Sequence, residues 1–321
     1  MRSLARLFAS VAASVALSGA AHAQSYPVKP VRFVVAFAPG GAADLVARLL
    51  GQKIGEQWGQ AIVVENRGGA GGTVAAQQIA KSAPDGYTVL VTTSALPVSA
   101  ALNPGAGYDA ERDFVPVTLA ASSPNIIVAS PASGIRTLRE AMDRAKSGKL
   151  NYATAGAGTT PHLSAEYLFK VLGKVDVVHV PYKGAGPAIQ ALVAGETELA
   201  SIAISAAVPQ VKGGKAIGLA VTSDKRVAAL PEVPTVAEAG FPGFADYTWV
   251  GLFLPAGAPP EVVARLNEEA QKALRAPDVR EKLAAVGFEP VGSGPREFAP
   301  YLKDELAKWG KVVKETGAKA E

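Results

Sequence analysis

The turn that decides the fold of this chain reads Phe37-Ala38-Pro39-Gly40-Gly41-Ala42-Ala43-Asp44. The apolar run Val31–Ala38 predicts a strand that enters the turn, and the pattern over Ala43–Gln57 predicts a helix that leaves it. Two glycines allow the backbone to approach a ligand closely, and the first turn of a helix carries N–H groups without intrahelical acceptors. This geometry is suited to binding an anion without a charged side chain.

A second turn of the same kind lies near the middle of the chain, at Gly156-Ala157-Gly158-Thr159-Thr160-Pro161-His162. Thr160 is a favourable N-cap residue and Pro161 suits the first helical position, so we expect a helix to start here. The hydroxyls of Thr159 and Thr160 are suited either to donating to a carboxylate or to capping the helix. Two anion-binding turns, one in each half of the chain, indicate a clamp that closes on a small carboxylate.

Strand and helix patterns alternate over most of the chain, which predicts an α/β fold with mainly parallel sheets covered by helices. The predicted strands are Val31–Ala38, Ala61–Glu65, Thr88–Thr92, Val115–Ala120, Asn125–Ser130, Asn151–Ala155, Val177–Val180, Ile217–Thr222 and Trp249–Pro255. The predicted helices are Ala43–Gln57, Val74–Lys81, Thr137–Lys146, Pro187–Ala194, Pro260–Arg275, Asp278–Val286 and Pro295–Thr316. We expect the last three helices to pack on the first sheet, so that the chain crosses between two lobes near Ala120–Pro124 and near Tyr247–Gly251.

The N-terminal residues have the pattern of a secretory signal peptide. Arg2 and Arg6 precede a short apolar stretch, Leu7–Leu17, and Ala21-His22-Ala23 is a small-residue cleavage site. We expect cleavage after Ala23 and a free periplasmic protein. The chain contains no cysteine, which excludes a disulfide and a lipid anchor on the mature N-terminus. The formal net charge is +4, which gives no case for a nucleic-acid partner.

The sequence carries no motif typical of catalysis. Outside the signal peptide the only histidines are His162 and His179, and no G-x-S-x-G, H-E-x-x-H or cysteine nucleophile occurs. The glycines of Asn66–Thr73 lack the third glycine of a dinucleotide loop and the GK[ST] ending of a phosphate loop. No cluster of His, Asp and Glu has metal-ligand spacing. We therefore expect no catalytic residue, no cofactor and no metal.

Three polar residues near the glycine turns leave two interpretations open. Asp44 is suited to the ligand site or to a helix-end ion pair with Arg48, four residues on. His162 is suited to donating to an anion or to lying on the surface. Lys183, in the glycine-rich turn Pro181–Pro187, is suited to neutralising an anion or to lying in solvent.

Many ordered motifs carry a resemblance to a known family. They are Tyr26-Pro-Val-Lys-Pro30, Pro39-Gly-Gly with Asp44, Val64-Glu-Asn-Arg67, Ala83-Pro-Asp-Gly-Tyr87, Asn151-Tyr152, Gly158-Thr159 with His162, Val180-Pro-Tyr-Lys-Gly184, Leu219-Ala-Val-Thr-Ser223, Leu230-Pro-Glu-Val-Pro-Thr235 and Pro277-Asp-Val-Arg280. In these the chain closely resembles the Bug-type, or TctC-type, solute-binding proteins of tripartite tricarboxylate transporters.

The resemblance implies a two-lobed periplasmic binding protein of type II, with a ligand cleft between two doubly wound lobes. Residues 24–120 and 251–321 would form lobe 1, and residues 121–250 lobe 2. It also implies a small carboxylate held largely by backbone N–H groups and bridging waters. The expected ligand-binding residues are Phe37, Gly40, Gly41, Ala42, Ala43, Asp44, Ser94, Gly158, Thr159, Thr160, His162, Lys183, Gly184 and Ser201.

Some positions depart from the family pattern and bear on the choice of ligand. Ala43 stands where Thr or Ser is common, and Ser201 where a bulky aromatic residue is common. Arg67-Gly68 replaces a usual basic-Pro pair, and the Asn103–Asp109 segment is shorter than usual. We expect a carboxylate with at least one further polar end, while the smaller residues also suit an aromatic or branched acid.

The resemblance implies delivery of the bound carboxylate to membrane subunits of the TctA and TctB type, and we expect a monomer. Two other classes of function remain open. Ligand-loaded protein could dock on a receptor kinase as a periplasmic sensor partner, and a secreted hydrolase could use a doubly wound sheet of this kind.

Overall fold

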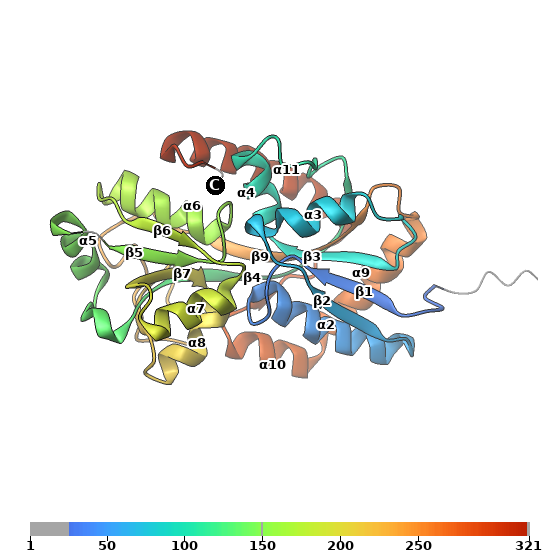
Figure 1. Cartoon of the computed structure of the whole chain (residues 1–321). Helices are drawn as coiled ribbons and strands as arrows, with labels where there is room; N and C mark the ends of the chain where they lie inside the picture. Colours follow the sequence, from blue (N-terminus) through green and yellow to red (C-terminus); the bar gives the residue numbers. More distant parts are fainter. Residues whose placement is uncertain (1–25, 149, 320–321) are drawn as a thin grey trace, which may run out of the picture.

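One long strand, β4 (Phe114–Ala129), runs through both halves of the molecule (Figure 1). In the computed structural model, which describes residues 26–148 and 150–319, β4 pairs with β9 (Tyr247–Pro255) as far as Pro124. From Asn125 onward it pairs instead with β7 (Leu199–Ala203) and β8 (Ile217–Val221). The two parts of the sheet therefore share one strand. The predicted signal peptide lies outside the described residues.

The strands of the described residues follow the order β2-β1-β3-β9-β4-β7-β5-β6. The other strands are β1 (Val31–Val35), β2 (Ile62–Asn66), β3 (Thr88–Thr93), β5 (Asn151–Thr154), β6 (Val178–Pro181) and β10 (Glu289–Pro290). Strands β8 and β10 each pair with β4 outside this order. The pairs β1–β2, β1–β3, β5–β6 and β5–β7 are parallel, whereas β4 and β9 run antiparallel to their neighbours. We call the part built on β1, β2, β3 and β9 lobe 1, and the part built on β5 to β8 lobe 2.

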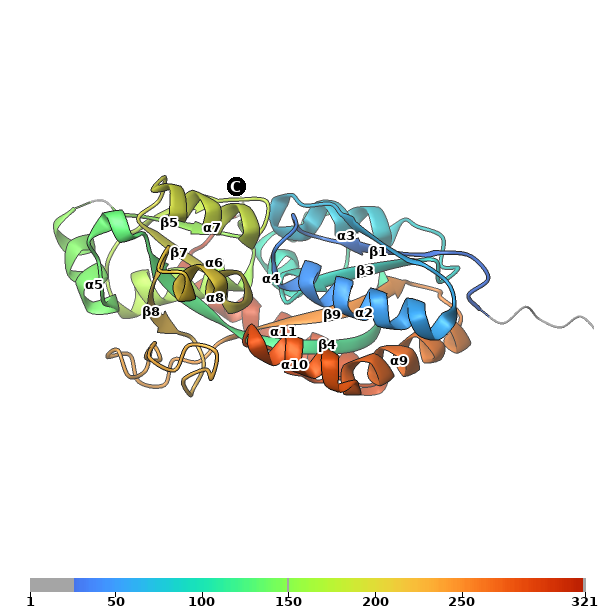
Figure 2. The ribbon, with the colours of Figure 1, turned by 90° about the horizontal axis from the view of Figure 1, so that it is seen from below.

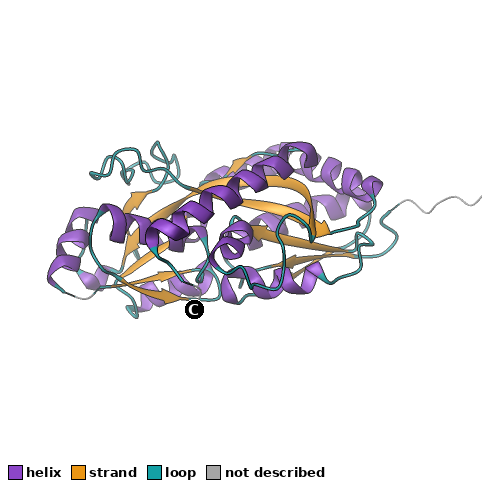
Figure 3. Ribbon diagram, turned by 90° about the horizontal axis from the view of Figure 1, so that it is seen from above, coloured by secondary structure: helices purple, strands orange, loops and turns teal. Residues whose placement is uncertain are grey.

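Helices cover both faces of the sheet in each lobe, as the views from below and from above show (Figures 2 and 3). The helices of lobe 1 are α2 (Ala42–Trp58), α3 (Thr73–Ala80), α4 (Ala95–Leu102), α9 (Pro260–Arg275), α10 (Pro277–Ala285) and α11 (Pro295–Thr316), with the short 3₁₀ turn Ala70–Gly72. The helices of lobe 2 are α5 (Leu138–Ser147), α6 (Thr160–Glu166), α7 (Ala185–Ala194) and α8 (Ile204–Lys212), with the 3₁₀ turn Pro131–Ser133. A π-helical segment, Tyr167–Leu172, continues α6.

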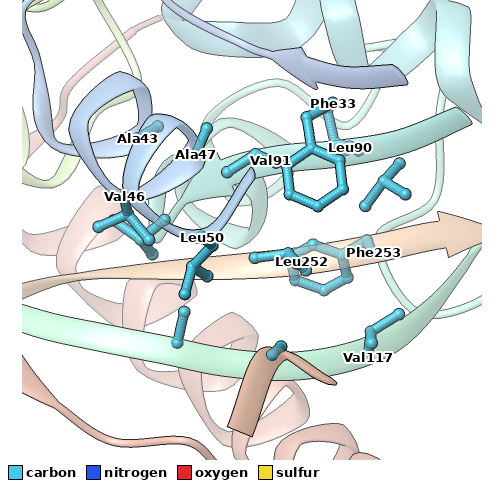
Figure 4. Close-up of a cluster of buried hydrophobic side chains, with 14 of the residues drawn as sticks. Phe33, Ala43, Val46, Ala47, Leu50, Leu90, Val91, Val117, Leu252 and Phe253 are labelled. Atoms are coloured by element: carbon cyan, nitrogen blue, oxygen red, sulfur yellow. The ribbon is translucent and has the colours of Figure 1, made fainter. Parts of the chain in front are cut away.

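The core of lobe 1 holds the first glycine turn in place. Val46, Ala47 and Leu50 on one face of α2 are fully buried and pack toward Phe33 of β1 and Phe253 of β9 (Figure 4). Complete burial of a leucine or phenylalanine side chain contributes about 1.5–3 kcal/mol. The start of α2 is therefore fixed relative to the end of β1.

The C-terminal helix α11 contacts both lobes. Trp309 of α11 shares a small hydrophobic cluster with Val98 of α4 and Leu163 of α6. In addition, the indole N–H groups of Trp249 and Trp309 both donate to the carboxylate of Glu305, at 3.0 and 3.1 Å. This helix thus connects β9 with one helix of each lobe, α4 and α6.

Most predicted elements are confirmed within a few residues, and Pro260–Arg275 and Pro295–Thr316 have the predicted bounds. The N-cap of α6 is Thr159, so the prediction that Thr160 takes this position was wrong. The sequence analysis did not predict α4, β7 or α8. These elements are short and mostly buried on all sides, so they have no amphipathic pattern to identify them.

Candidate functional site

A small cavity lies where the two lobes meet, next to the first glycine turn. It is lined by Phe37, Gly41, Ala42, Ala43, Thr93, Ala155, Thr159, Pro161, Ala185, Ala203 and Thr248. Its volume is about 30 Å³, which is room for one or two water molecules. An acid with several carbon atoms is larger than this volume, and we call the arrangement of the lobes seen here the closed form.

Four helices from different parts of the chain begin at this cavity. Gly41 precedes α2, Thr159 precedes α6, Ala185 is the first residue of α7 and Ala203 precedes α8. The N-terminus of a helix carries the positive end of its dipole and N–H groups without intrahelical acceptors. Their convergence makes the cavity favourable for negative charge although no charged side chain lines it.

The first glycine turn presents free backbone donors. Gly41 is the N-cap of α2 in an extended conformation (φ −97°), and no side chain caps the helix. Among the described residues, no protein acceptor meets the N–H groups of Ala42 and Ala43. Gly40 has φ +89°, a left-handed conformation that favours glycine. The turn therefore leaves backbone donors at residues that line the cavity, and their role in binding an anion stays a prediction.

Asp44 braces this turn and does not line the cavity. Its buried carboxylate accepts bonds from the Gly40 N–H at 3.0 Å, from Arg48 Nε at 3.0 Å and from Asn66 Nδ2 at 2.9 Å. Burial acts to raise the pKa of this carboxyl, but the bonds from Arg48, Gly40 and Asn66 together outweigh it and hold the pKa below its ordinary value. The helix-end pair with Arg48 is present, and the carboxylate also accepts the hydrogen bond from the Gly40 N–H.

His162 supports the second glycine turn from within lobe 2. The Gly158 N–H donates to His162 Nδ1 at 3.3 Å, and the imidazole stacks on that of His179 with 4.0 Å between ring centres. Burial lowers the pKa of His162 to about 4. Burial, followed by the charges of His162 and Lys170, lowers the pKa of His179 to about 3. Both rings are therefore neutral at pH 7, and the Nδ1 of His162 acts as an acceptor that orients Gly158.

The hydroxyl groups around the cavity bond within the protein. Thr159 Oγ1 donates to the Gly156 carbonyl at 2.7 Å, and Ser201 Oγ donates to the Pro161 carbonyl at 2.9 Å. Ser94 and Thr160 share a hydrogen bond between the lobes. In this closed form the free donors are thus backbone N–H groups, and the hydroxyls hold the turns in position.

The remaining predicted residues lie around the cavity. Phe37 is in its wall. Lys183 contributes its carbonyl, which accepts from the Ala38 N–H at 2.9 Å, while the residue itself is exposed. Gly184 (φ +153°) is buried against Ala38. The closed form therefore shows no contact between the Lys183 side chain and the cavity that would support its role as a direct counter-charge.

Comparison with known proteins shows which family has this sequence and architecture. A family model described as "Tripartite tricarboxylate transporter family receptor", TctC, matches residues 46–318. The chain belongs to the TctC family. It is similar to the structure of the periplasmic binding protein BugD, with 32% identity and a TM-score of 0.88 over 92% of this chain and 100% of that one.

Two further structures similar to this TctC-family protein contain carboxylates. R. palustris Rpa4515 with adipate is 34% identical, with a TM-score of 0.88 over 92% of this chain and 99% of that one. MatC (Rpa3494) from Rhodopseudomonas palustris with bound malate is 38% identical, with a TM-score of 0.85 over 90% of this chain and 100% of that one. The fold class, the two-lobed periplasmic binding protein, is thus confirmed.

Sequence reasoning missed several residues that line the cavity of this TctC-family protein: Thr93, Ala155, Pro161, Ala185, Ala203 and Thr248. Ala185 follows a predicted glycine turn, and that turn was a usable signal. The alanines otherwise carry no chemical signature, and Thr248 comes from a distant segment. Among residues 26–148 and 150–319, no cluster of His, Asp or Glu is arranged to hold a metal, and no helix is long and apolar enough to span a membrane.

Proposed function

We propose that this protein captures a small carboxylate in the periplasm and delivers it to a membrane transporter with subunits of the TctA and TctB type. The observation that carries the proposal is the convergence of four helix N-termini on one cavity without a charged side chain. Membership of the TctC family and the adipate and malate held by similar proteins support it.

Backbone donors supply enough free energy for useful affinity. A hydrogen bond to a charged group contributes about 1.5–3 kcal/mol. Two or three such bonds per carboxylate support micromolar binding, about 8 kcal/mol, after the cost of ordering. We propose that Gly41, Ala42 and Ala43 of lobe 1 and Thr159 and Thr160 of lobe 2 provide these contacts.

The proposal includes a division of the chain and a processing step. Residues 24–120 and 251–321 form lobe 1 and residues 121–250 form lobe 2; the change in the pairing partners of β4 after Pro124, a few residues from the first boundary, supports this division. Signal peptidase removes residues 1–23. N-terminal sequencing of protein recovered from the periplasm tests the cleavage after Ala23.

A thermal-shift screen with malate, adipate, tricarboxylates and aromatic acids tests the binding function. We expect at least one acid to raise the unfolding temperature without being consumed. Its methyl ester should bind at least tenfold more weakly, because esterification removes charge-assisted bonds worth more than about 1.4 kcal/mol. Equal affinity for acid and ester contradicts carboxylate recognition. Turnover of the acid would favour a hydrolase, and a receptor kinase in a membrane pull-down would favour a sensor partner.

A further inference from the structure

The two lobes meet outside the cavity along a line of glycines. On lobe 1 the line consists of Pro39-Gly40, Gly68 and Gly71, and on lobe 2 it consists of Ala157-Gly158 and Lys183–Gly186. A Cβ placed on Gly71 would lie 2.0 Å from the Ala157 carbonyl oxygen, and one placed on Gly68 would lie 2.6 Å from that of Lys183. We call this contact the glycine seam. Its backbones approach more closely than side chains would permit.

Hydrogen bonds cross the seam directly from one lobe to the other. The Ala38 N–H donates to the Lys183 carbonyl at 2.9 Å, and Ser99 Oγ donates to the Gly158 carbonyl at 2.9 Å. Ala38, Ser99, Lys183 and Gly158 do not line the cavity. These bonds therefore stabilise the closed form by contacts that need no ligand.

Among the seam glycines whose backbone conformation would accept a side chain, Gly186 makes the closest contact with the other lobe. It lies in the first turn of α7. A Cβ at this position would lie 2.2 Å from the Pro39 carbonyl oxygen, 3.3 Å from the Pro39 carbonyl carbon and 3.6 Å from the Gly40 Cα. All three atoms belong to lobe 1. A side chain at Gly186 would therefore fit within lobe 2 and collide only when the lobes close.

We infer that Gly186, which lies outside the ligand cavity, determines ligand affinity by allowing the glycine seam to form. The seam holds the lobes closed even before ligand is bound. This inference rests on the proposed binding function and adds to it a residue that acts through closure. In this proposal the lobes close over the ligand with the seam in contact while the cavity walls make room for the acid, so a variant whose seam cannot form loses affinity in proportion to the loss of that population.

The test compares Gly186→Ala with Gly310→Ala. Gly310 lies inside α11, and a Cβ there would meet no atom within 4 Å, so it controls for the same change of residue in a helix without a seam contact. Small-angle scattering of the ligand-free proteins should give a larger radius of gyration for Gly186→Ala than for the parent and for Gly310→Ala. An equal radius in all three proteins would overturn the inference.

Calorimetry with malate and adipate gives the second readout. We expect Gly186→Ala to bind at least tenfold more weakly than the parent, with Gly310→Ala unchanged; equal affinity for Gly186→Ala and the parent also overturns the inference. If the parent binds neither acid nor any other carboxylate, the proposed function fails, while the scattering comparison still decides whether the seam forms.

A second variant keeps the test valid if Gly186→Ala does not fold. Ser99→Ala removes a hydrogen bond across the seam without adding atoms. It should enlarge the ligand-free radius and weaken binding about twofold to tenfold, the range for one hydrogen bond of about 0.5–1.5 kcal/mol. An unchanged radius together with unchanged affinity would show that the seam does not support the closed form.

Discussion

A Cβ built on Gly41 lies 3.6 Å from the Cβ of Ala185, although the two residues begin helices of different lobes. This separation is within the range of Cβ atoms joined by a disulfide. The chain has no cysteine of its own, so an introduced pair cannot exchange with another thiol of the protein. The relationship therefore offers a direct way to lock the closed form.

We predict that the double variant Gly41→Cys and Ala185→Cys, once oxidised without ligand, does not bind a carboxylate, because the locked lobes cannot separate to admit one. Reduction should restore binding. Calorimetry before and after reduction measures both states, and the two single variants serve as controls. Normal binding by the fully oxidised protein would mean that ligands enter without separation of the lobes.

At Gly41 itself, the size of the substituted side chain should decide the result. Gly41→Ala adds a Cβ at an ordinary contact distance from Ala185, and the extended backbone accepts any residue. We expect it to bind within tenfold of the parent. Gly41→Val adds two more methyl groups at the cavity wall and should abolish binding while the unfolding temperature stays close to that of the parent. Normal affinity of Gly41→Val in a titration would reduce the first turn to a structural role.

Glu305 should be important for stability because it accepts from two indole N–H groups. The residue is buried, and Lys308 also donates to it at 3.2 Å. Glu305→Leu leaves the indole donors of Trp249 and Trp309 unpaired, at a cost of about 2–5 kcal/mol. Glu305→Gln keeps an acceptor oxygen and should lose less. Urea unfolding compares the two variants; equal stability would contradict the importance of these bonds.

The neutral His162 should make the folded protein sensitive to acid. Its pKa of about 4 lies below the ordinary 6.5. The unfolded chain therefore takes up a proton first as pH falls, and stability is full above pH 6.5 and is lost between pH 6.5 and 4, by about 3 kcal/mol. Burial raises the pKa of Asp246 to about 6, which acts in the opposite direction over part of this range.

A comparison with His162→Asn isolates this effect. The amide oxygen of asparagine takes a position similar to Nδ1, so the bond from the Gly158 N–H is retained while the titration is removed. Unfolding free energies measured from pH 7 to pH 4 should fall less steeply for this variant than for the parent. Parallel curves would show that His162 does not titrate differently in the folded and unfolded states.

The sequence predicted the two glycine turns and the helices that follow them, because these depend on backbone preferences within a few residues. It predicted β4 as two strands, Val115–Ala120 and Asn125–Ser130, since the polar residues Ser122 and Ser123 and the following Pro124 interrupt the apolar pattern. In the structure the strand continues because β9 pairs with this segment. It also left the role of His162 open, since its acceptor role depends on the fold of the turn.

The sequence by itself determined most of the alternation of strands and helices, the family resemblance and the two glycine turns that lead into α2 and α6. Local steric limits on glycine and the unpaired donors of a first helical turn are sufficient for this. Only the tertiary structure decided which helix starts face one cavity, and that Gly186 meets Pro39 while Gly41 meets Ala185. Those contacts join segments far apart in the chain, and their partners are set by the packing of two lobes around a shared strand.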